Sequence, residues 1–448
     1  MVDLTSRMAP YFDSHLILPL LDSLRDSGLA DPKTITKEKI AILAKTNMVD
    51  VMCDEYEKPE CDPEVKASFK AQKAAIEKRK EEIFGVLDNE PEVVTEVGAF
   101  FQNKELVFEM KSSGQLNAEG IASAHGITTD KLTAYHKNAK FKYECGMYDQ
   151  AEEMLTHCLT VQQIPGSMRL GALWGRLACR ILQAKWDETL ADFNAIKDAI
   201  ESRNVPPPPL DQIRLRAWLM HWGLFVHCNR QDGIDSLAEL FTNQAYQQTM
   251  ENLCPWMLRY QTMAVILSPG RRGGSMLRNI LEEIKSLNYL YSDPITQFLE
   301  SLYTQFDFDE AQKRLVECQE LIKNDFFLQK FGDRFTHEAR VLICEMYCTI
   351  NRRVDLSMLS SKLQLSEEEA EKWMVQMVRG SASHSASSID AKINSSEKQV
   401  IMAAYSKSTQ QMVADRTSEL TQRTAAMASA MEKVMREGKD FIRARDAE

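Results

Sequence analysis

The sequence predicts a mostly α-helical protein in which a helical-repeat solenoid leads into a winged helix and then a long C-terminal helix. Three observations support this fold class. A four-position motif recurs through the middle of the chain. Residues 355–393 have the pattern of helix, turn, helix and strand. Residues from about 396 to 444 contain no proline and are rich in Ala, Met, Lys, Glu and Gln, which favours a single helix.

The recurring motif resembles the start of the second helix in a tetratricopeptide-like hairpin. A large residue wedges between hairpins, an aspartate caps the helix, a small residue allows close approach, and a large apolar residue enters the core. The first two copies start at residues 148 and 186, a spacing of 38 that is close to one repeat. Later copies are irregular, so we expect a degenerate array. The copies are Tyr148-Asp149-x-Ala151-x-x-x-Leu155, Trp186-Asp187-x-Thr189-x-x-x-Phe193, Phe308-Asp309-x-Ala311-x-x-x-Leu315 and the weaker Ile234-Asp235-x-Leu237-x-x-x-Phe241.

Two breaks interrupt this array. Pro206 to Pro209 predicts a stiff exposed linker. Residues 268–274 predict a mobile basic loop that contains Arg271 and Arg272. The loop lacks the Gly-Lys-Ser/Thr ending of a phosphate-binding loop, so we reject nucleotide binding there. Contact of Arg271 and Arg272 with RNA is a weak alternative to a solvated turn between helices.

The N-terminal region also predicts helices. Residues 1–56 favour two or three, with apolar faces formed by Leu16, Leu20, Leu21 and Leu24 and by Ile40, Leu43 and Met48. From Glu64 to about Leu87 a Lys/Glu-rich helix follows, in which Phe69, Ile76 and Ile83 are spaced by seven residues. Such a narrow seam can dock on a partner helix, but we favour a solvated helix with one buried edge.

The winged-helix prediction rests on local signals between residues 355 and 393. Leu356, Leu359 and Leu363 form the apolar stripe of a first short helix. Ser366 and Glu369 have the spacing of a capping box for the second helix. We expect that helix to bury Ala370, Trp373, Met374, Met377 and Val378 and to end at Gly380. A Ser/Ala loop then leads to a strand at residues 389–393.

The charge of the second helix argues against DNA reading. A helix that enters the major groove needs Arg or Lys near phosphates and base edges. This helix begins with Glu367, Glu368, Glu369 and Glu371, and only Lys372 and Arg379 oppose them. The glutamates suit a helix N-terminus but repel a polyanion. We therefore interpret the winged helix as a protein–protein module.

The predicted C-terminal helix has an apolar edge and too little core of its own. This suggests packing in a multi-subunit bundle, with Met412, Leu420 and Met427 as candidate partner contacts, and a frayed tail is the alternative. The edge consists of Val400, Ala404, Met412, Leu420, Met427, Met431 and Val434.

Composition limits the function classes further. The 448 residues are 44% hydrophobic and 27% charged, as in ordinary soluble globular proteins. A net charge of −11 argues against a general nucleic-acid coat. Ten scattered cysteines without a small-domain framework fit reduced thiols in a cytosolic or nuclear protein. We expect neither a signal peptide nor a membrane span, because Asp3 and Arg7 interrupt the start and no apolar run approaches about 18 residues.

We find no pattern that predicts catalysis. The eight histidines form no H-E-x-x-H or comparable motif, and no nucleophile is paired with a base. Cys344 and Cys348 are spaced by four, but no further ligands complete a zinc site, so we assign them to the core. His221 and His227 are assigned to the core or its rim. The sequence therefore predicts a non-enzyme without metal, cofactor or small-molecule substrate.

Together these parts resemble the PCI family, whose members scaffold the proteasome lid, the COP9 signalosome and eukaryotic translation initiation factor 3. The similarity is most specific to the initiation factor 3 members and covers nearly the whole chain, except residues 57–120 and 415–448 and a wing insertion at Ser381 to Ser388. The stretches that carry it include Thr46-Asn47-Met48-Val49-Asp50, Lys140-Phe141-x-Tyr143-Glu144-Cys145-Gly146-x-Tyr148, Leu173-Trp174-Gly175-x-Leu177-Ala178, Trp218-Leu219-x-His221-Trp222, Cys254-Pro255-x-x-Leu258-Arg259-Tyr260, Asp293-Pro294-Ile295-Thr296, Asn324-Asp325-Phe326-Phe327-Leu328, Ala370-Glu371-x-Trp373 and Asp390-Ala391-Lys392-Ile393.

The resemblance implies a cytoplasmic scaffold, with an additional nuclear pool as an alternative. It implies binding to other PCI-type subunits of initiation factor 3 and to the small ribosomal subunit during initiation and mRNA recruitment. We expect the strand edge at Ile389, Ala391 and Ile393 to be extended by a partner strand. The rivals are a proteasome-lid or signalosome scaffold and a winged-helix nucleic-acid regulator.

We expect four regions along the chain. These are N-terminal helices at 1–125, a solenoid at 126–330 whose PCI helical part starts at about 215, the winged helix at 331–405, and the C-terminal helix at 406–448.

Overall fold

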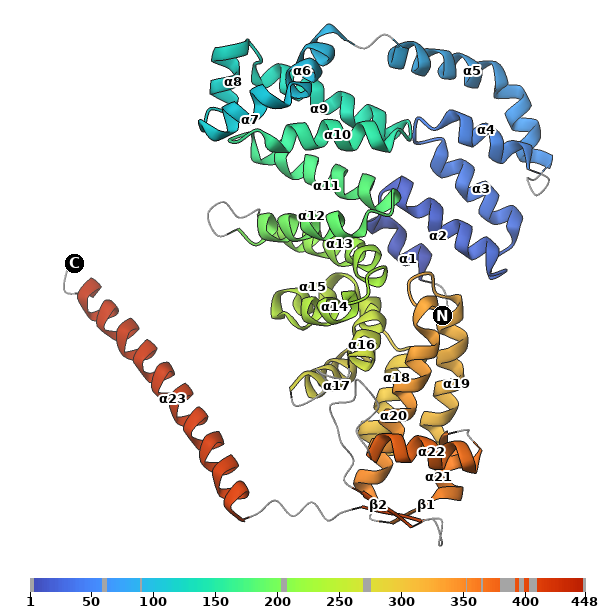
Figure 1. Cartoon of the computed structure of the whole chain (residues 1–448), viewed down its shortest axis with the longest axis vertical. Coiled ribbons are helices and arrows are strands. Elements are labelled where there is room, and N and C mark those ends of the chain that lie inside the picture. Colours follow the sequence, from blue (N-terminus) through green and yellow to red (C-terminus); the bar gives the residue numbers. More distant parts are fainter. Residues whose placement is uncertain are drawn as a thin grey trace. The chain divides into compact units, whose positions relative to one another are not determined.

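A computed structural model describes residues 4–58, 63–88, 91–202, 208–268, 275–351, 353–363, 366–378, 391–394, 399–402 and 409–445 (Figure 1). The chain forms two compact units. The first, the helical unit, comprises Met1–Tyr347 with residues 362–365 and 382–387. The second, the winged-helix unit, comprises residues 348–361, 366–381 and 388–448. The predicted fold class is confirmed, because stacked helices fill the first unit and a small sheet with two short helices lies in the second.

The beginning of the helical unit contains more helices than the sequence predicted. Asp13 and Asp31 cap the starts of two of these helices. The side chain of each accepts a hydrogen bond from the backbone N–H two residues further on. Lys39 is buried and joins three of these helices by ion pairs with Asp22 at 2.7 Å and Glu55 at 3.0 Å. The elements are α1 (Thr5–Met8), η1 (Ala9–Tyr11), α2 (Ser14–Asp26), α3 (Pro32–Leu43), α4 (Val49–Glu57) and α5 (Pro63–Asp88).

Helix α5 has one buried edge, as predicted. Ile76 and Ile83 pack against a buried cluster of Leu43, Val49 and Met52, whereas Phe84 on the same helix is exposed. The side chain of Phe69 lies outside the described residues. The apolar edge of α5 is therefore covered by neighbouring helices of the same chain.

The remaining helices of this unit stack on one another along the chain (Figure 1). Pro209, expected in a linker, is instead the first residue of α13, where its missing N–H costs no hydrogen bond. Residues 203–207 and 269–274 lie outside the described residues. The elements are α6 (Glu92–Gln102), α7 (Lys104–Ser112), α8 (Ala118–His125), α9 (Thr129–Glu144), α10 (Tyr148–Thr160), α11 (Gly166–Leu182), α12 (Trp186–Ile200), α13 (Pro209–Cys228), α14 (Gly233–Thr242), α15 (Gln244–Leu253), η2 (Pro255–Met257), α16 (Leu258–Leu267), α17 (Ser275–Leu287), α18 (Pro294–Glu300), η4 (Ser301–Gln305), α19 (Phe308–Asn324), η5 (Gln329–Phe331) and α20 (Gly332–Ile350).

The repeat motif marks helix starts, as predicted. Helices α10, α12 and α19 begin at the first motif residues, Tyr148, Trp186 and Phe308, and α14 begins one residue before Ile234. The small motif positions are fully buried, which allows neighbouring helices to approach closely. The large apolar positions enter the core, namely Leu155, Phe193, Leu315 and Phe241.

The predicted capping role of the motif aspartate is wrong. Asp149 and Asp187 lie inside the first helical turn, and the cap positions before them hold Met147 and Lys185 without a side-chain cap. A carboxylate in the first turn still favours the positive end of the helix dipole, which explains its presence there. In α19 the cap is Asp307, which accepts hydrogen bonds from the backbone N–H groups two and three residues further on, both at 3.0 Å.

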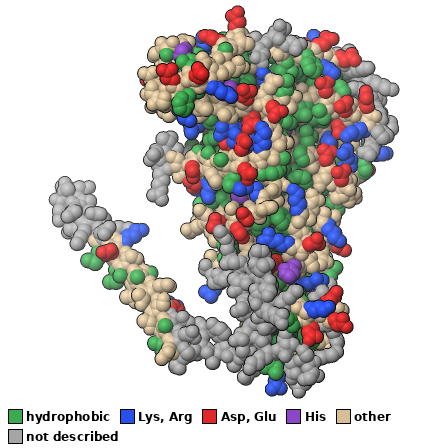
Figure 2. All heavy atoms as spheres, in the orientation of Figure 1, with side chains coloured by type: hydrophobic (Ala, Val, Ile, Leu, Met, Phe, Trp, Pro, Cys, Tyr) green, Lys and Arg blue, Asp and Glu red, His purple; other side chains and the backbone are tan. Residues whose placement is uncertain are grey.

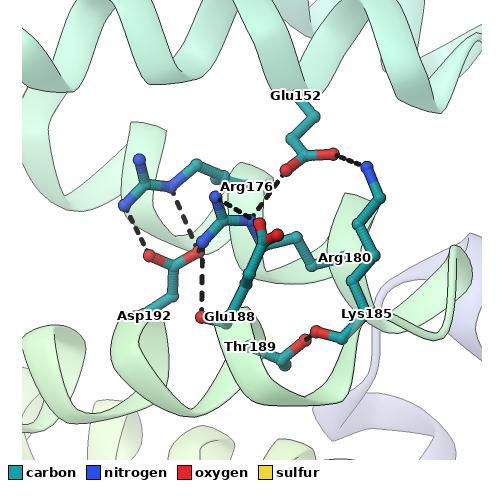
Figure 3. Close-up of polar contacts among 7 residues, drawn as sticks. All are labelled: Glu152, Arg176, Arg180, Lys185, Glu188, Thr189 and Asp192. Carbon is teal, nitrogen blue, oxygen red and sulfur yellow. Dashed lines mark hydrogen bonds and ion pairs between the residues drawn. The ribbon is translucent and has the colours of Figure 1, made fainter.

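A network of charged side chains joins α10, α11 and α12 (Figure 3). Arg180 of α11 lies between two carboxylates, Glu152 of α10 at 2.8 Å and Asp192 of α12 at 2.9 Å. Arg176 donates two hydrogen bonds of 2.5 and 3.1 Å to Asp192, and Lys185 forms an ion pair with Glu152 at 2.6 Å. Bidentate pairs of this kind have strict geometry. The network therefore fixes the orientation of three successive helices.

The N-terminal segment packs against helices that lie more than 200 residues away in sequence. The ring of Tyr11 stacks on His221 with centroids 4.3 Å apart, and its carbonyl accepts a hydrogen bond of 3.0 Å from Trp222. Phe12 contacts the rings of Phe225 and Phe327. These aromatic pairs add to the stabilisation from burial. His221 and His227 are buried, which confirms their assignment to the core.

A fully buried ionic centre lies at the end of the array. Arg259 of α16 has no exposed surface and pairs with Asp293 at 2.9 Å and Asp325 at 3.1 Å. Tyr291 donates a hydrogen bond of 2.9 Å to Asp293, and Tyr260 donates one of 3.1 Å to Asp325. Each carboxylate also orders backbone: Asp293 caps α18, and Asp325 accepts from backbone N–H groups of the turn before η5. One guanidinium thus holds three segments together.

We predict that removing this cation destabilises the chain strongly. In Arg259→Met the two carboxylates remain buried without their partner, which should lower the free energy of unfolding by about 3–5 kcal/mol. The matched control is Arg314→Met on α19, where the ion pairs with Glu310 and Glu317 are partly exposed to solvent and the expected loss is below about 1 kcal/mol. Urea unfolding followed by circular dichroism measures both. Equal losses in the two variants would contradict the assignment.

We also predict a pH effect at Glu283 of α17. Burial, with a smaller contribution from Glu251, raises the pKa of Glu283 to about 7, against hydrogen bonds from Gln261 at 2.7 Å and Gln247. A carboxyl whose pKa is raised on folding stabilises the fold below its unfolded pKa, and this contribution is lost as pH rises through 7. Urea titrations at pH 6 and pH 8 should show that Glu283→Gln loses less stability than the wild type over this range. The exposed neighbour Glu282→Gln is the control and should behave as the wild type; a Glu283→Gln profile parallel to both would refute the prediction.

Candidate partner-binding surfaces of the winged-helix unit

The winged-helix unit contains a three-stranded antiparallel sheet, whereas the sequence analysis places a single strand, at residues 389–393. Its strands are β1 (Arg353–Asp355), β2 (Ala391–Asn394) and β3 (Gln399–Met402), in the order β1-β3-β2. β3 is therefore central. Val400, which we had placed on the C-terminal helix, is a buried residue of β3. Val400 and its neighbour Ile401 are both β-branched, which favours strand over helix.

Two short helices lie between β1 and β2 in the sequence, α21 (Leu356–Leu363) and α22 (Glu367–Val378). The predicted capping box is confirmed, since Glu369 N–H donates to Ser366 Oγ at 3.3 Å and Ser366 N–H donates to Glu369 Oε2 at 3.2 Å. The buried side chains include Leu356, Leu359, Ala370 and Met374. Trp373 is only half-buried, and Gly380 with the side chains of Met377 and Val378 lies outside the described residues.

The predicted strand edge lies on β2. Ala391 is opposite Met402 of β3, and Ile393 is opposite Val400. β2 is the last strand of the sheet as described, so one side of it pairs with β3 and the other side is the sheet edge. Backbone amides of consecutive residues in a strand point to opposite sides, so the amides of Ala391 and Ile393 point in the same direction. Ile389 lies outside the described residues.

The C-terminal helix is present as α23 (Thr409–Arg445) and exposes a large apolar stripe. Leu420 and Met427, two predicted contacts, are 53% and 67% exposed. The side chain of Met412, the third, lies outside the described residues. Sequence reasoning missed Val413, which is also exposed and begins a strict seven-residue spacing. Figure 2 shows apolar side chains open to solvent along this helix. The exposed large apolar residues of the helix are Val413, Leu420, Met427, Met431, Val434 and Met435.

Seven-residue spacing is the signal of helices that pack against another helix with a left-handed twist. The first half of the stripe is flanked by charge: Glu419 pairs with Arg416 at 2.8 Å and with Arg423 at 2.5 Å. The second half is richer in Met and is bordered by alanines, which permit close approach of a partner. Large apolar patches of this kind mark interaction sites.

Other candidate residues do not form a site in the described part of the chain. Arg271 and Arg272 lie outside the described residues. Cys344 and Cys348 are buried in α20, which confirms their assignment to the core. Among the described residues, no group of three or more His, Cys, Asp or Glu side chains could hold a metal ion. Nor does any described helix combine the length and apolar character needed to cross a bilayer.

Comparison with known proteins agrees with this architecture. Residues 3–142 match the model of the eIF3 subunit 6 N terminal domain, and residues 296–403 match the PCI domain. The chain is 34% identical to the E subunit of eukaryotic translation initiation factor 3 from Aspergillus clavatus over 421 residues, which is 93% of this chain and 90% of the relative. It is 33% identical to the same protein of Aspergillus niger over 437 residues, and 34% identical to that of Botryotinia fuckeliana over 441 residues. Each of these two alignments covers 96% of this chain and 93% of the relative.

Similarity at this level over nine-tenths of both sequences leaves no room for the proteasome-lid and signalosome alternatives. The chain belongs to the family of the E subunit of eukaryotic translation initiation factor 3, in which an N-terminal helical domain is combined with a PCI domain.

Proposed function

We propose that this chain is a non-catalytic scaffold that joins other PCI-type subunits of initiation factor 3 in the cytoplasm and acts on the small ribosomal subunit during initiation and mRNA recruitment. The observation that carries the proposal is the apolar stripe of α23, whose large side chains are more than half exposed. A chain in water gains by covering such a stripe, at roughly 25 cal/mol for each Å² of apolar surface removed from water. The seven-residue spacing indicates that helices cover it.

The family relationship supports the identity of the partners, because the relatives are named as subunits of that factor. We propose that the β2 edge and α23 are its two assembly surfaces, with Ile389, Ala391 and Ile393 on the former and Met412, Leu420 and Met427 on the latter. Arg271 and Arg272 are proposed only as weak RNA contacts. In this proposal the chain consists of N-terminal helices at 1–125, a solenoid at 126–330, a winged helix at 331–405 and a C-terminal helix at 406–448.

Gentle affinity purification, sedimentation and mass spectrometry test the proposed function. We expect the chain to co-migrate with other initiation factor 3 subunits and with small ribosomal subunits. Recovery of the chain without these subunits would contradict the scaffold role. Salt-sensitive binding to duplex DNA would instead support a nucleic-acid regulator, which the exposed Glu368 and Glu369 at the start of α22 disfavour.

For the helix surface, we predict that Leu420→Asp with Met427→Asp reduces co-purification of sister subunits at least tenfold. Both side chains are exposed in the chain alone, so its own stability should change by less than about 0.5 kcal/mol. The control is Ser418→Asp with Ser429→Asp, which adds the same charge to the opposite face of α23. Equal recovery of sister subunits by both double variants would rule out the stripe as an assembly surface.

For the strand edge, we predict that one of two neighbouring proline variants blocks assembly without unfolding the chain. Ala391 and Lys392 point their N–H groups to opposite sides of β2, so one proline removes a bond to β3 and the other removes a bond at the free edge. Thermal unfolding identifies the variant that keeps the wild-type fold. That variant should lose co-purification of sister subunits, and normal recovery would show that no partner strand pairs there.

A further inference from the structure

A cleft of about 540 Å³ lies in the N-terminal half of the helical unit, away from the surfaces discussed above. Helix α9 forms its floor, and α6 and α10 form its walls. Its volume is within the range of sites that hold small ligands or short peptide segments. Three features of its lining indicate what it binds.

The first feature is a glycine in the middle of α6. Gly98 lines the cleft, and a Cβ atom placed on it would meet no atom within 4 Å. Two other helical glycines are explained by packing, since a Cβ on Gly175 would lie 3.0 Å from Leu155 and one on Gly223 would lie 3.1 Å from Phe193. Glycine weakens a helix interior but lets a second backbone approach closely. At Gly98 that space faces the cleft.

The second feature is a histidine held in a fixed orientation on the opposite wall. The ring of His157 stacks on Phe101 with centroids 4.9 Å apart, and its Nδ1 lies 3.0 Å from the hydroxyl of Tyr135. Burial lowers the pKa of His157, so its ring is neutral at pH 7 and has one donor and one acceptor nitrogen. Within the described part of the chain Nε2 makes no hydrogen bond. The cleft therefore contains one positioned polar group ready for a ligand.

The third feature is the balance of polar groups. Gln102 on one wall and Gln150 on the other have exposed amide groups, each with donors and an acceptor. The two charged residues of the lining, Lys142 and Glu153, have opposite charges, so the lining has no net charge. Such a lining suits a peptide main chain, which presents one donor and one acceptor per residue.

A partner helix fits less well. A helix with side chains is 10–12 Å across, so this volume would hold about one turn, and its backbone groups would already be paired. We propose that the cleft binds a short, extended and uncharged segment of another initiation factor 3 subunit, whose main chain passes over Gly98 and pairs with Gln102, Gln150 and His157. The identity of the partner rests on the proposed function; the extended, uncharged character rests on the cleft alone.

The test uses the full chain and overlapping synthetic peptides that together span the other subunits of the factor, with binding followed by fluorescence anisotropy. We expect at least one peptide from an uncharged stretch to bind. Gly98→Leu, which fills the open space at the wall, should weaken that binding about tenfold or more. The matched control is Gly85→Leu in α5, another helical glycine whose Cβ would meet nothing within 4 Å and which does not line the cleft.

A second variant tests recognition of the main chain. Gln102→Ala with Gln150→Ala removes exposed amides without touching the core and should weaken binding about three- to tenfold, as expected for lost hydrogen bonds. Circular dichroism confirms that each variant is folded. The proposal is overturned if no peptide binds, if Gly98→Leu and Gly85→Leu bind equally, or if only strongly charged peptides respond. Such a result would leave co-purification with the factor intact, so it is distinguishable from failure of the proposed function.

Discussion

One buried guanidinium connects the parts of this protein that carry its other features. Arg259 joins the start of α18, through Asp293, to the turn before η5, through Asp325. Buried charges are stable only when they are paired and hydrogen-bonded, so these three segments must come together in one arrangement. The N-terminal segment reaches the same centre, because the hydroxyl of Tyr260, which donates to Asp325, also lies 3.5 Å from the sulfur of Met8. The first helix of the helical unit is thus linked to segments more than 200 residues further along the chain.

This constraint is one of several contacts that tie together distant segments of a degenerate repeat array. In a regular solenoid each hairpin contacts only its neighbours, and ends open independently. Here the N-terminal aromatic residues Tyr11 and Phe12 bridge to α13 and the region of Phe327. Between these ends, the ion-pair network around Arg180 fixes successive helices.

The sequence predicted what depends on local pattern. Helix starts at Tyr148, Trp186 and Phe308 follow from residues within one turn, and the capping box of Ser366 and Glu369 follows from a spacing of three. The short strands β1 and β3 were missed because three or four residues carry little periodicity of their own. The ionic centre was also missed, since its residues come from three stretches, around 259, 293 and 325, whose convergence is purely tertiary. Those same stretches are among the ones on which the resemblance to the PCI family rests.

The candidate contacts on α23 were predicted in part. Leu420 and Met427 belong to the exposed stripe, and Val413, which the sequence analysis does not include, extends it by seven residues toward the start of the helix. Burial cannot be read from spacing alone: the Ile76 and Ile83 seam of α5 is covered by its own chain, whereas the α23 stripe is open.

The central claim is that the chain combines a rigid helical unit with an α23 stripe that partner helices cover. Hydrogen–deuterium exchange of the free chain and of the purified factor tests it most directly. In the free chain, amides around Arg259, Asp293 and Asp325 and those of residues 5–12 should exchange slowest, and amides of α23 should exchange fast; in the factor, α23 should become protected. Fast exchange of α23 in both states, or independent opening of residues 5–12, would contradict the account.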